Sequence, residues 1–270
     1  MSLQKQENRF ILINKGEDIM SLPIALQLYS IKDETQKDFE LALRRVAQIG
    51  YAGVEFAGYG GLSSLKLKAL LDELNLKVCG SHVSLEELTH NIDGVIEYNL
   101  EIGNPYIICP YALYNERADY ENMAQTLNEL SLKCNAKGIL LGYHNHGHEF
   151  QKFDGEYGLD IIYKGSNAKL VKAEIDTYWV AYAGLDPVEY INKHAGRCDL
   201  IHIKDMEIVD GEKRSTEVGN GIMDIKSIIV AAQLQGAKWL IVEQEFFNKP
   251  TFESVEIGFK NLKKIIKDGV

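Results

Sequence analysis

The chain lacks an excess of positive charge. Its 270 residues include 29 lysines and arginines against 39 aspartates and glutamates, which gives a formal net charge of -10. Proteins that bind phosphate backbones hold them with clustered Lys and Arg side chains. The composition therefore argues against a surface for polyanions, and we expect no nucleic acid among the partners of this protein.

Long apolar runs are also missing. No stretch reaches the roughly 18 apolar residues that a membrane-spanning helix needs. The N-terminal sequence MSLQKQENRF has no apolar segment of the kind found in secretory signals. From these absences we expect a cytoplasmic protein with no membrane partner, and a homo-oligomer is compatible with the sequence.

Cysteine is scarce and forms no paired motif. The four cysteines are Cys79, Cys109, Cys134 and Cys198; none belongs to a CxxC pair, and three lie in or beside apolar runs. Free cysteine behaves as a small buried hydrophobe, whereas disulfide frameworks are typical of smaller secreted chains. We therefore expect four reduced cysteines in the core.

The chain does contain a regular alternation of short apolar runs with longer segments of helical period. The predicted strands are Ile24 to Tyr29, Gly53 to Phe56, Lys77 to His82, Tyr106 to Pro110, Ile139 to Asn145, Leu170 to Asp176, Leu200 to Lys204 and Trp239 to Glu243. The predicted helices are Asp38 to Ile49, Ser64 to Leu74, Ile92 to Ile102, Tyr120 to Ala136, Pro187 to His194, Asp224 to Gln235 and Phe252 to Lys267.

Strands that alternate with helices imply a parallel sheet, and roughly 250 residues of such units are typical of an α/β protein with a (β/α)8 TIM barrel fold. The alternative is an open doubly wound sheet. A dinucleotide site in such a sheet usually has a glycine-rich first turn, but the first turn here, LYSIKDETQKD, has no glycine. No linker-like tract interrupts the chain, so we expect one barrel domain over residues 23–270 after an N-terminal extension over residues 1–22.

Two predicted loops are long, polar and glycine-containing. They are Gln151 to Gly158, after the fifth strand, and Met206 to Gly221, after the seventh. Loops of this kind are typical of hairpins or lids over an active face.

Acidic or imidazole side chains lie at or near the ends of the last four predicted strands. They are Glu149, Asp176, His202 and Glu243. The carboxyl ends of all strands in a closed parallel barrel open onto one face, where distant residues can meet around one ion. Burying a carboxylate costs several kcal/mol unless it is paired or binds a cation. The pattern therefore predicts a divalent metal site, and its mixed ligands suit Mn²⁺, Co²⁺, Zn²⁺ or Mg²⁺ without selecting among them.

Several ordered motifs resemble one family. They are LQLYSIKD (Leu26 to Asp33), YHNHGHEF (Tyr143 to Phe150), EIDTYW (Glu174 to Trp179), GRCDLIHIKD (Gly196 to Asp205), VGNG (Val218 to Gly221) and IVEQE (Ile241 to Glu245). Together they resemble the sugar phosphate isomerase/epimerase superfamily, the xylose-isomerase-like TIM barrels. The resemblance implies a metal held near the end of strand five and by Asp176, His202 and Glu243.

The sequence departs from the epimerases of this superfamily at two places. Tyr-His-Asn-His stands where many of them have Glu on strand five, so His144, His146 and Glu149 are all candidates for that ligand, with Glu149 favoured. Trp179 stands where they tend to have His. The second departure makes the chain look closer to the keto-inositol dehydratase and 3-keto-glycoside lyase branch.

The resemblance suggests a divalent-metal-dependent sugar isomerase or epimerase that removes a proton next to a metal-chelated carbonyl. Glu149 or Glu243 would be the base, His146 its acid/base partner, and Lys204 would polarise an oxygen or assist a leaving hydroxyl. Elimination of a β-hydroxyl on the same site would give a dehydratase or lyase. The substrate would be a small sugar or keto sugar.

Other residues are candidates for substrate contacts. His82 and His144 would reach substrate oxygens, Glu55 would bind a hydroxyl or lie at the rim, and Tyr111 and Trp179 would line the pocket. A carbohydrate-binding barrel without catalysis is the non-enzymatic alternative. An endonuclease on the same barrel is disfavoured, because the chain lacks a basic face for DNA.

Overall fold

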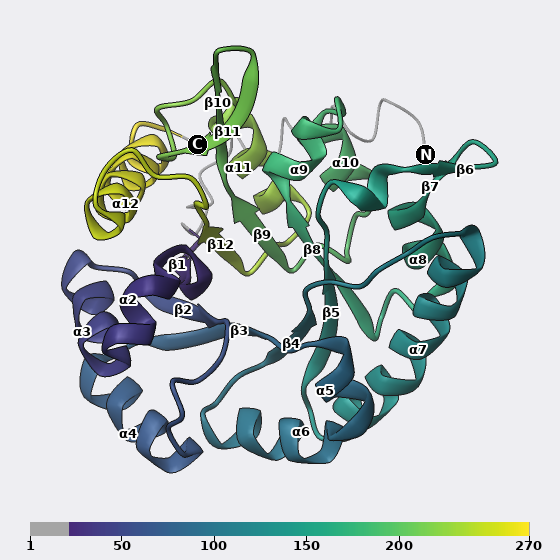
Figure 1. Cartoon of the computed structure of the whole chain (residues 1–270), viewed down its shortest axis with the longest axis horizontal. Coiled ribbons are helices and arrows are strands. Elements are labelled where there is room, and N and C mark those ends of the chain that lie inside the picture. The colour runs from purple at the N-terminus through teal and green to yellow at the C-terminus, as the bar shows by residue number, and fades with distance from the viewer. Residues whose placement is uncertain (1–21, 270) are drawn as a thin grey trace, which may run out of the picture.

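Eight parallel strands close into a barrel in the computed structural model, which describes residues 22–269 (Figure 1). The strands are β1 (Ile24–Gln27), β2 (Gly53–Phe56), β3 (Lys77–His82), β4 (Tyr106–Cys109), β5 (Leu140–His144), β8 (Val171–Asp176), β9 (Leu200–Ile203) and β12 (Trp239–Val242). Strand β1 pairs with both β2 and β12, so the barrel has no free edge. The predicted α/β barrel is confirmed. The predicted N-terminal extension lies outside the described residues, except for Leu22.

Helices surround the barrel in Figure 1. They are α2 (Lys32–Lys37), α3 (Phe39–Ile49), α4 (Ser64–Leu74), α5 (Leu85–His90), α6 (Ile92–Glu101), α7 (Arg117–Ala136), α8 (Gly158–Gly165), α9 (Thr177–Tyr182), α10 (Pro187–Lys193), α11 (Ile225–Leu234) and α12 (Thr251–Lys267). Two 3₁₀ turns, η1 (Leu28–Ile31) and η2 (His148–Phe150), follow β1 and β5. Side-chain caps start several helices; Asp38 accepts from the backbone N–H of Leu41 at the start of α3.

The long loops form two hairpins. One pairs β6 (Lys152–Phe153) with β7 (Glu156–Tyr157), and the other pairs β10 (Asp205–Val209) with β11 (Glu212–Thr216). Both loops were predicted as hairpin-like or lid-like excursions. The second hairpin rises above the ring of helices in Figure 1.

The sequence analysis did not predict four of the helices. The longest of the four is α8. Its sequence, GLDIIYKG, has a glycine at each end, which is typical of a loop. In the structure both glycines lie where the helix packs closely against α7. A Cβ at Gly158 would overlap the ring of Tyr120, and one at Gly165 would lie 2.8 Å from the Cβ of Ala124. The close approach of α7 and α8 therefore requires these glycines. The other three helices, α2, α5 and α9, have six residues each, too few for a clear helical period.

Apolar side chains fill two separate parts of the molecule. The larger core lies between the barrel and the helices, and a smaller cluster includes Ala25, Cys79, Ile108, Leu200 and Ile241. Side chains alternate along a strand, so positions two residues further along β9 and β12 share the face of Leu200 and Ile241. Those positions are His202 and Glu243. The apolar cluster thus gives way to charged side chains toward the carboxyl ends of the strands.

All four cysteines are buried and free, as the sequence predicted. No helix among residues 22–269 is long and apolar enough to cross a membrane.

Candidate metal centre

Four side chains from neighbouring strands converge at the carboxyl end of the barrel. They are His144, Asp176, His202 and Glu243, and each offers a ligand atom within 4.8 Å of those of the other three. His144 ends β5, Asp176 ends β8, His202 lies on β9 and Glu243 follows β12. The strand order β12-β9-β8-β5 makes these four strands consecutive in the barrel wall. All four side chains are buried.

These residues fit a divalent cation. His202 Nδ1 lies 3.1 Å from Glu243 Oε2, which is about the spacing of two ligands that each lie about 2.1 Å from one ion. Two imidazoles and two carboxylates give the mixed donor set that Zn²⁺, Mn²⁺ or Co²⁺ accepts. Two buried carboxylates also supply the negative charge that such an ion would neutralise.

Hydrogen bonds hold Asp176 in place from two sides. Its Oδ1 accepts hydrogen bonds from the backbone N–H groups of Tyr178 and Trp179, at 2.8 and 3.1 Å, and so caps helix α9. Its own N–H donates to the side chain of Asn145 on the neighbouring chain segment, at 3.1 Å. Its Oδ2 faces Lys204 at 3.5 Å. One oxygen therefore anchors the residue, and the other faces the charged site.

Lys204 is a fully buried cation beside the proposed ligands. Its Nζ lies 3.4 Å from Glu243 Oε2 and 3.1 Å from Glu245 Oε2. Burial raises the pKa of Asp176 to about 7, although Lys204 opposes the shift. Burial also acts to raise the pKa of Glu243, but Lys204 and His202 outweigh it and hold that pKa below its usual value. Lys204 and the carboxylates thus form one electrostatic unit.

Glu149 occupies a different position from the one expected for the strand-five ligand. Its Oε1 accepts a hydrogen bond from the hydroxyl of Tyr143 and its Oε2 accepts one from the backbone N–H of His146, both at 2.8 Å. The turn η2 folds Glu149 back toward Tyr143. The structure therefore brings His144, and not Glu149, together with Asp176, His202 and Glu243.

An aromatic group lies next to the four converging residues. The ring of His146 lies 5.6 Å from Tyr111 and 5.8 Å from Trp179, between centroids. Nδ1 of His146 is buried without a hydrogen-bond partner among the described residues. Burial lowers the pKa of His146 to about 4, so the imidazole is neutral at pH 7. Tyr111 is half exposed, as a residue at the rim of a pocket would be.

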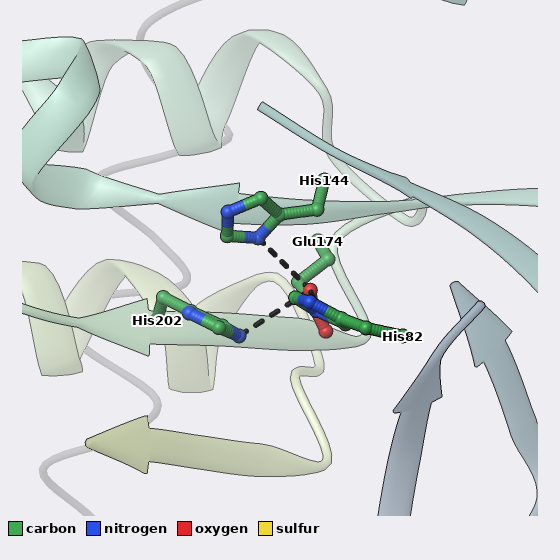
Figure 2. Close-up of side chains that lie close together, drawn as sticks. All are labelled: His82, His144, Glu174 and His202. Carbon is green, nitrogen blue, oxygen red and sulfur yellow. Dashed lines mark hydrogen bonds and ion pairs between the residues drawn. The ribbon is translucent and has the colours of Figure 1, made fainter. Parts of the chain in front are cut away.

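Glu55 and His82 lie deeper than the sequence suggested. Glu55 is fully buried and accepts a hydrogen bond at 2.7 Å from Nε2 of His202, so it neither lies at the rim nor faces solvent. His82 Nε2 lies 2.7 Å from Glu174 Oε2, and its side chain is 11% exposed (Figure 2). Burial alone would lower the pKa of His82, but Glu55 and Glu174 raise it to about 10.

Glu174 and Gln27 also belong to this interior. Glu174 is fully buried beside His82 and His144, and Gln27 donates to Glu55 at 2.8 Å. Glu174 precedes Asp176 by two residues, and strand alternation therefore puts both side chains on the same side of β8. Gln27 has no such neighbour on β1.

The model of the family described as "Xylose isomerase-like TIM barrel" matches residues 43–265. The chain belongs to this family. Among curated proteins with a similar sequence, the inosose dehydratase of Clostridium beijerinckii is 25% identical over 250 residues, which cover 78% of this chain and 83% of the relative.

Solved structures give the same picture of this TIM barrel. A sugar phosphate isomerase/epimerase from Parabacteroides distasonis superposes with a TM-score of 0.77 at 26% identity, covering 92% of this chain and 98% of that one. The IolI protein with a bound zinc atom superposes with a TM-score of 0.69 at 17% identity, covering 92% and 97%. The second likeness shows the fold alone.

Proposed function

We propose that this member of the xylose isomerase-like family is a divalent-metal-dependent enzyme that removes a proton next to the carbonyl of a keto sugar or keto-inositol. The observation that carries the proposal is the convergence of His144, Asp176, His202 and Glu243 on one small volume. These four side chains would hold the ion. When bound, the ion would supply Lewis-acid stabilisation of the negative charge that develops on the carbonyl oxygen.

Dehydration is the outcome that we propose. Lys204 is a buried cation next to the proposed ligands, where it can donate a proton to a departing hydroxyl. Trp179 and Tyr111 offer apolar faces against which a sugar ring can pack. The curated inosose dehydratase, similar over most of the chain, supports a keto-inositol as the substrate class.

His146 is the proposed base. It is neutral at pH 7, its Nδ1 has no partner among the described residues, and it lies between the two aromatic side chains. In the proposed step His146 takes the proton from carbon, and the electron pair of that C–H bond forms a carbon–carbon double bond. The C–O bond to the neighbouring hydroxyl breaks, and the hydroxyl leaves as water with a proton from Lys204.

The sequence analysis expected Glu149 or Glu243 as the base, and this proposal gives that role to neither of them. Glu149 is hydrogen-bonded to Tyr143, and burial raises its pKa. Glu243 belongs to the proposed ligand set.

Isomerisation or epimerisation is the second candidate function, supported by the Parabacteroides neighbour. It would require return of the proton to carbon instead of loss of a hydroxyl. Cytoplasmic location and a homo-oligomer stay predictions.

The test is proton exchange in D₂O with a panel of inososes and keto sugars, followed by NMR. Protein loaded with Mn²⁺ or Co²⁺ should exchange a substrate C–H and, for an inosose, form an enone with ultraviolet absorption. A chelator or the His202→Ala change should abolish both signals. Sugar binding that ignores the chelator, with no exchange in any substrate, would instead indicate a carbohydrate-binding barrel.

A further inference from the structure

A second layer of charged residues lies directly beneath the proposed metal ligands. It consists of Glu55, His82 and Glu174, and it contacts both imidazoles of the ligand set. His144 Nδ1 lies 2.9 Å from Glu174 Oε2, and His202 Nε2 lies 2.7 Å from Glu55 Oε2. Each imidazole therefore has one nitrogen bound to a carboxylate of this layer, and the other nitrogen of His202 lies 3.1 Å from Glu243 Oε2.

This layer could be mistaken for a second metal site, because His82, His144, Glu174 and His202 also form a compact group of ligand atoms. However, Glu174 Oε2 itself lies between the three imidazoles. Its distances are 2.7 Å to His82 Nε2, 2.9 Å to His144 Nδ1 and 3.3 Å to His202 Nε2. The oxygen occupies the place that a cation would take, and these are hydrogen-bond distances. The geometry is that of a carboxylate that accepts from imidazole N–H groups.

Figure 2 shows where the remaining nitrogens lie. The Nδ1 of His144 and the Nε2 of His202 point toward Glu174, and the second nitrogen of each ring lies on the side away from Glu174. For His202 that second nitrogen is Nδ1, which lies 3.1 Å from Glu243 Oε2. The second nitrogen of His202 thus faces the proposed ligand Glu243.

We infer that Glu174 and Glu55 are positioning residues that fix the tautomers of the two metal-binding imidazoles. A carboxylate that accepts from one ring nitrogen holds the proton there and leaves the lone pair of the other nitrogen for the metal. His144 therefore presents Nε2 to the ion, and His202 presents Nδ1. The inference rests on the proposed metal site and adds the identity of the ligating atoms.

A glycine on the neighbouring strand provides the space for the Glu55 carboxylate. A Cβ at Gly80 on β3 would overlap Oε1 of Glu55, so glycine is needed where the Glu55 carboxylate abuts the neighbouring strand. The pairing of β2 with β3 also shifts register between Val54 and Glu55. Gln27 Nε2 donates to Glu55 Oε2 at 2.8 Å, which fixes the carboxylate from the other side. Glu55 thus has little freedom to move away from His202.

The direct test is NMR of the full chain labelled with ¹⁵N-histidine and loaded with ¹¹³Cd²⁺. Couplings between cadmium and nitrogen identify the ligating atom of each ring. We expect coupling to Nε2 of His144 and to Nδ1 of His202, with a proton retained on the other nitrogen. Coupling to the opposite nitrogen of either ring would overturn the inference and leave the metal site intact. Failure of cadmium to bind would overturn the metal site and the inference together.

A second test uses Glu174→Gln and Glu55→Gln, with Asp199→Asn as the matched control. Asp199 is also a buried carboxylate, but it is bound to Tyr106 and Lys172, away from the imidazoles. Loss of a carboxylate behind a metal-binding histidine typically lowers metal affinity about 10- to 100-fold. In chelator competition, both Gln variants should show this loss of Cd²⁺ affinity. The Cd²⁺ affinity of the control should change by less than about twofold. Wild-type affinity in both Gln variants would overturn the inference.

Discussion

Lys204 Nζ lies 3.1 Å from Glu245 Oε2, and the lysine is fully buried whereas the glutamate side chain is 34% exposed. The pair lies at the boundary between the charged interior and solvent. On its inner side Lys204 also faces Asp176 and Glu243. Lys204 therefore compensates carboxylates that have no other lysine or arginine within 4 Å among residues 22–269.

Replacing Lys204 by Met should destabilise the metal-free protein by about 3 to 5 kcal/mol, because it leaves buried carboxylates without their cation. Urea unfolding in the presence of a chelator measures the change. Lys213→Met is the control: Lys213 is exposed on β11 and donates to a backbone carbonyl, so it should cost less than about 1 kcal/mol. Equal stability of the two variants would contradict this role of Lys204.

Asp205 organises the VGNG loop that follows the second hairpin. Its Oδ2 accepts from the backbone N–H groups of Gly219 and Gly221, and its Oδ1 from those of Met206 and Met223, at 2.8 to 3.2 Å. Asp205→Asn should cost about 2 to 3 kcal/mol, since an amide NH₂ replaces one acceptor and faces backbone donors.

Asp210→Asn is the control for that change. Asp210 lies in the turn of the same hairpin with φ of 53°, a conformation that Asn also tolerates. The free energy of unfolding of the Asp210→Asn variant, measured in urea, should equal that of the wild type. A similar loss in both variants would show that Asp205 has no special role in ordering the loop.

Asp160 should make stability depend on acid pH. Burial acts to raise its pKa, but His194, Lys193 and Tyr190 outweigh burial and lower the pKa below its usual value. A lowered folded-state pKa contributes stability that is present above the unfolded-state value, about 3.9, and is lost as the pH falls through the folded-state value. Asp160→Asn should therefore cost about 1 to 2 kcal/mol at pH 7.

The cost of Asp160→Asn should shrink below about pH 4, where the carboxylate begins to take up its proton in the unfolded state but not yet in the folded state. Urea unfolding of both proteins from pH 7 to pH 3 measures the difference. A cost that stays constant over this range would contradict the ion-pair explanation and favour a packing effect.

Metal should stabilise the fold. A cation that binds the folded state alone adds about 2.7 kcal/mol when its free concentration is 100 times its Kd. The melting temperature of the wild type should therefore rise as Mn²⁺ or Zn²⁺ is added, and that of the Asp176→Ala, His202→Ala double variant should not. An equal rise in both proteins would place the bound ions elsewhere.

The sequence predicted the fold well, because each strand is a short buried run with helical segments on both sides. Side-chain alternation also puts His202 and Lys204 on the same side of their strand, and Glu174 and Asp176 on the same side of theirs. Neighbouring strands β8 and β9 bring these pairs together. Periodicity along a strand is thus sufficient to find most of the charged interior.

The proposed strand-five ligand, His144, was harder to predict. The choice between His144 and Glu149 depends on the turn η2 and on the hydroxyl of Tyr143, which holds the Glu149 carboxylate. Neither feature follows from strand alternation. The complete burial of Glu55 was also hard to predict from the sequence, because it depends on the register of β2 against β3 and on the space at Gly80.

The most direct test of the metal site is an anomalous difference map at the manganese edge from crystals soaked in Mn²⁺. We predict one strong peak within bonding distance of His144, Asp176, His202 and Glu243, and no peak beside Glu149. A peak at Glu149, or one among His82, His144 and Glu174 in the deeper layer, would contradict the ligand set proposed for this barrel.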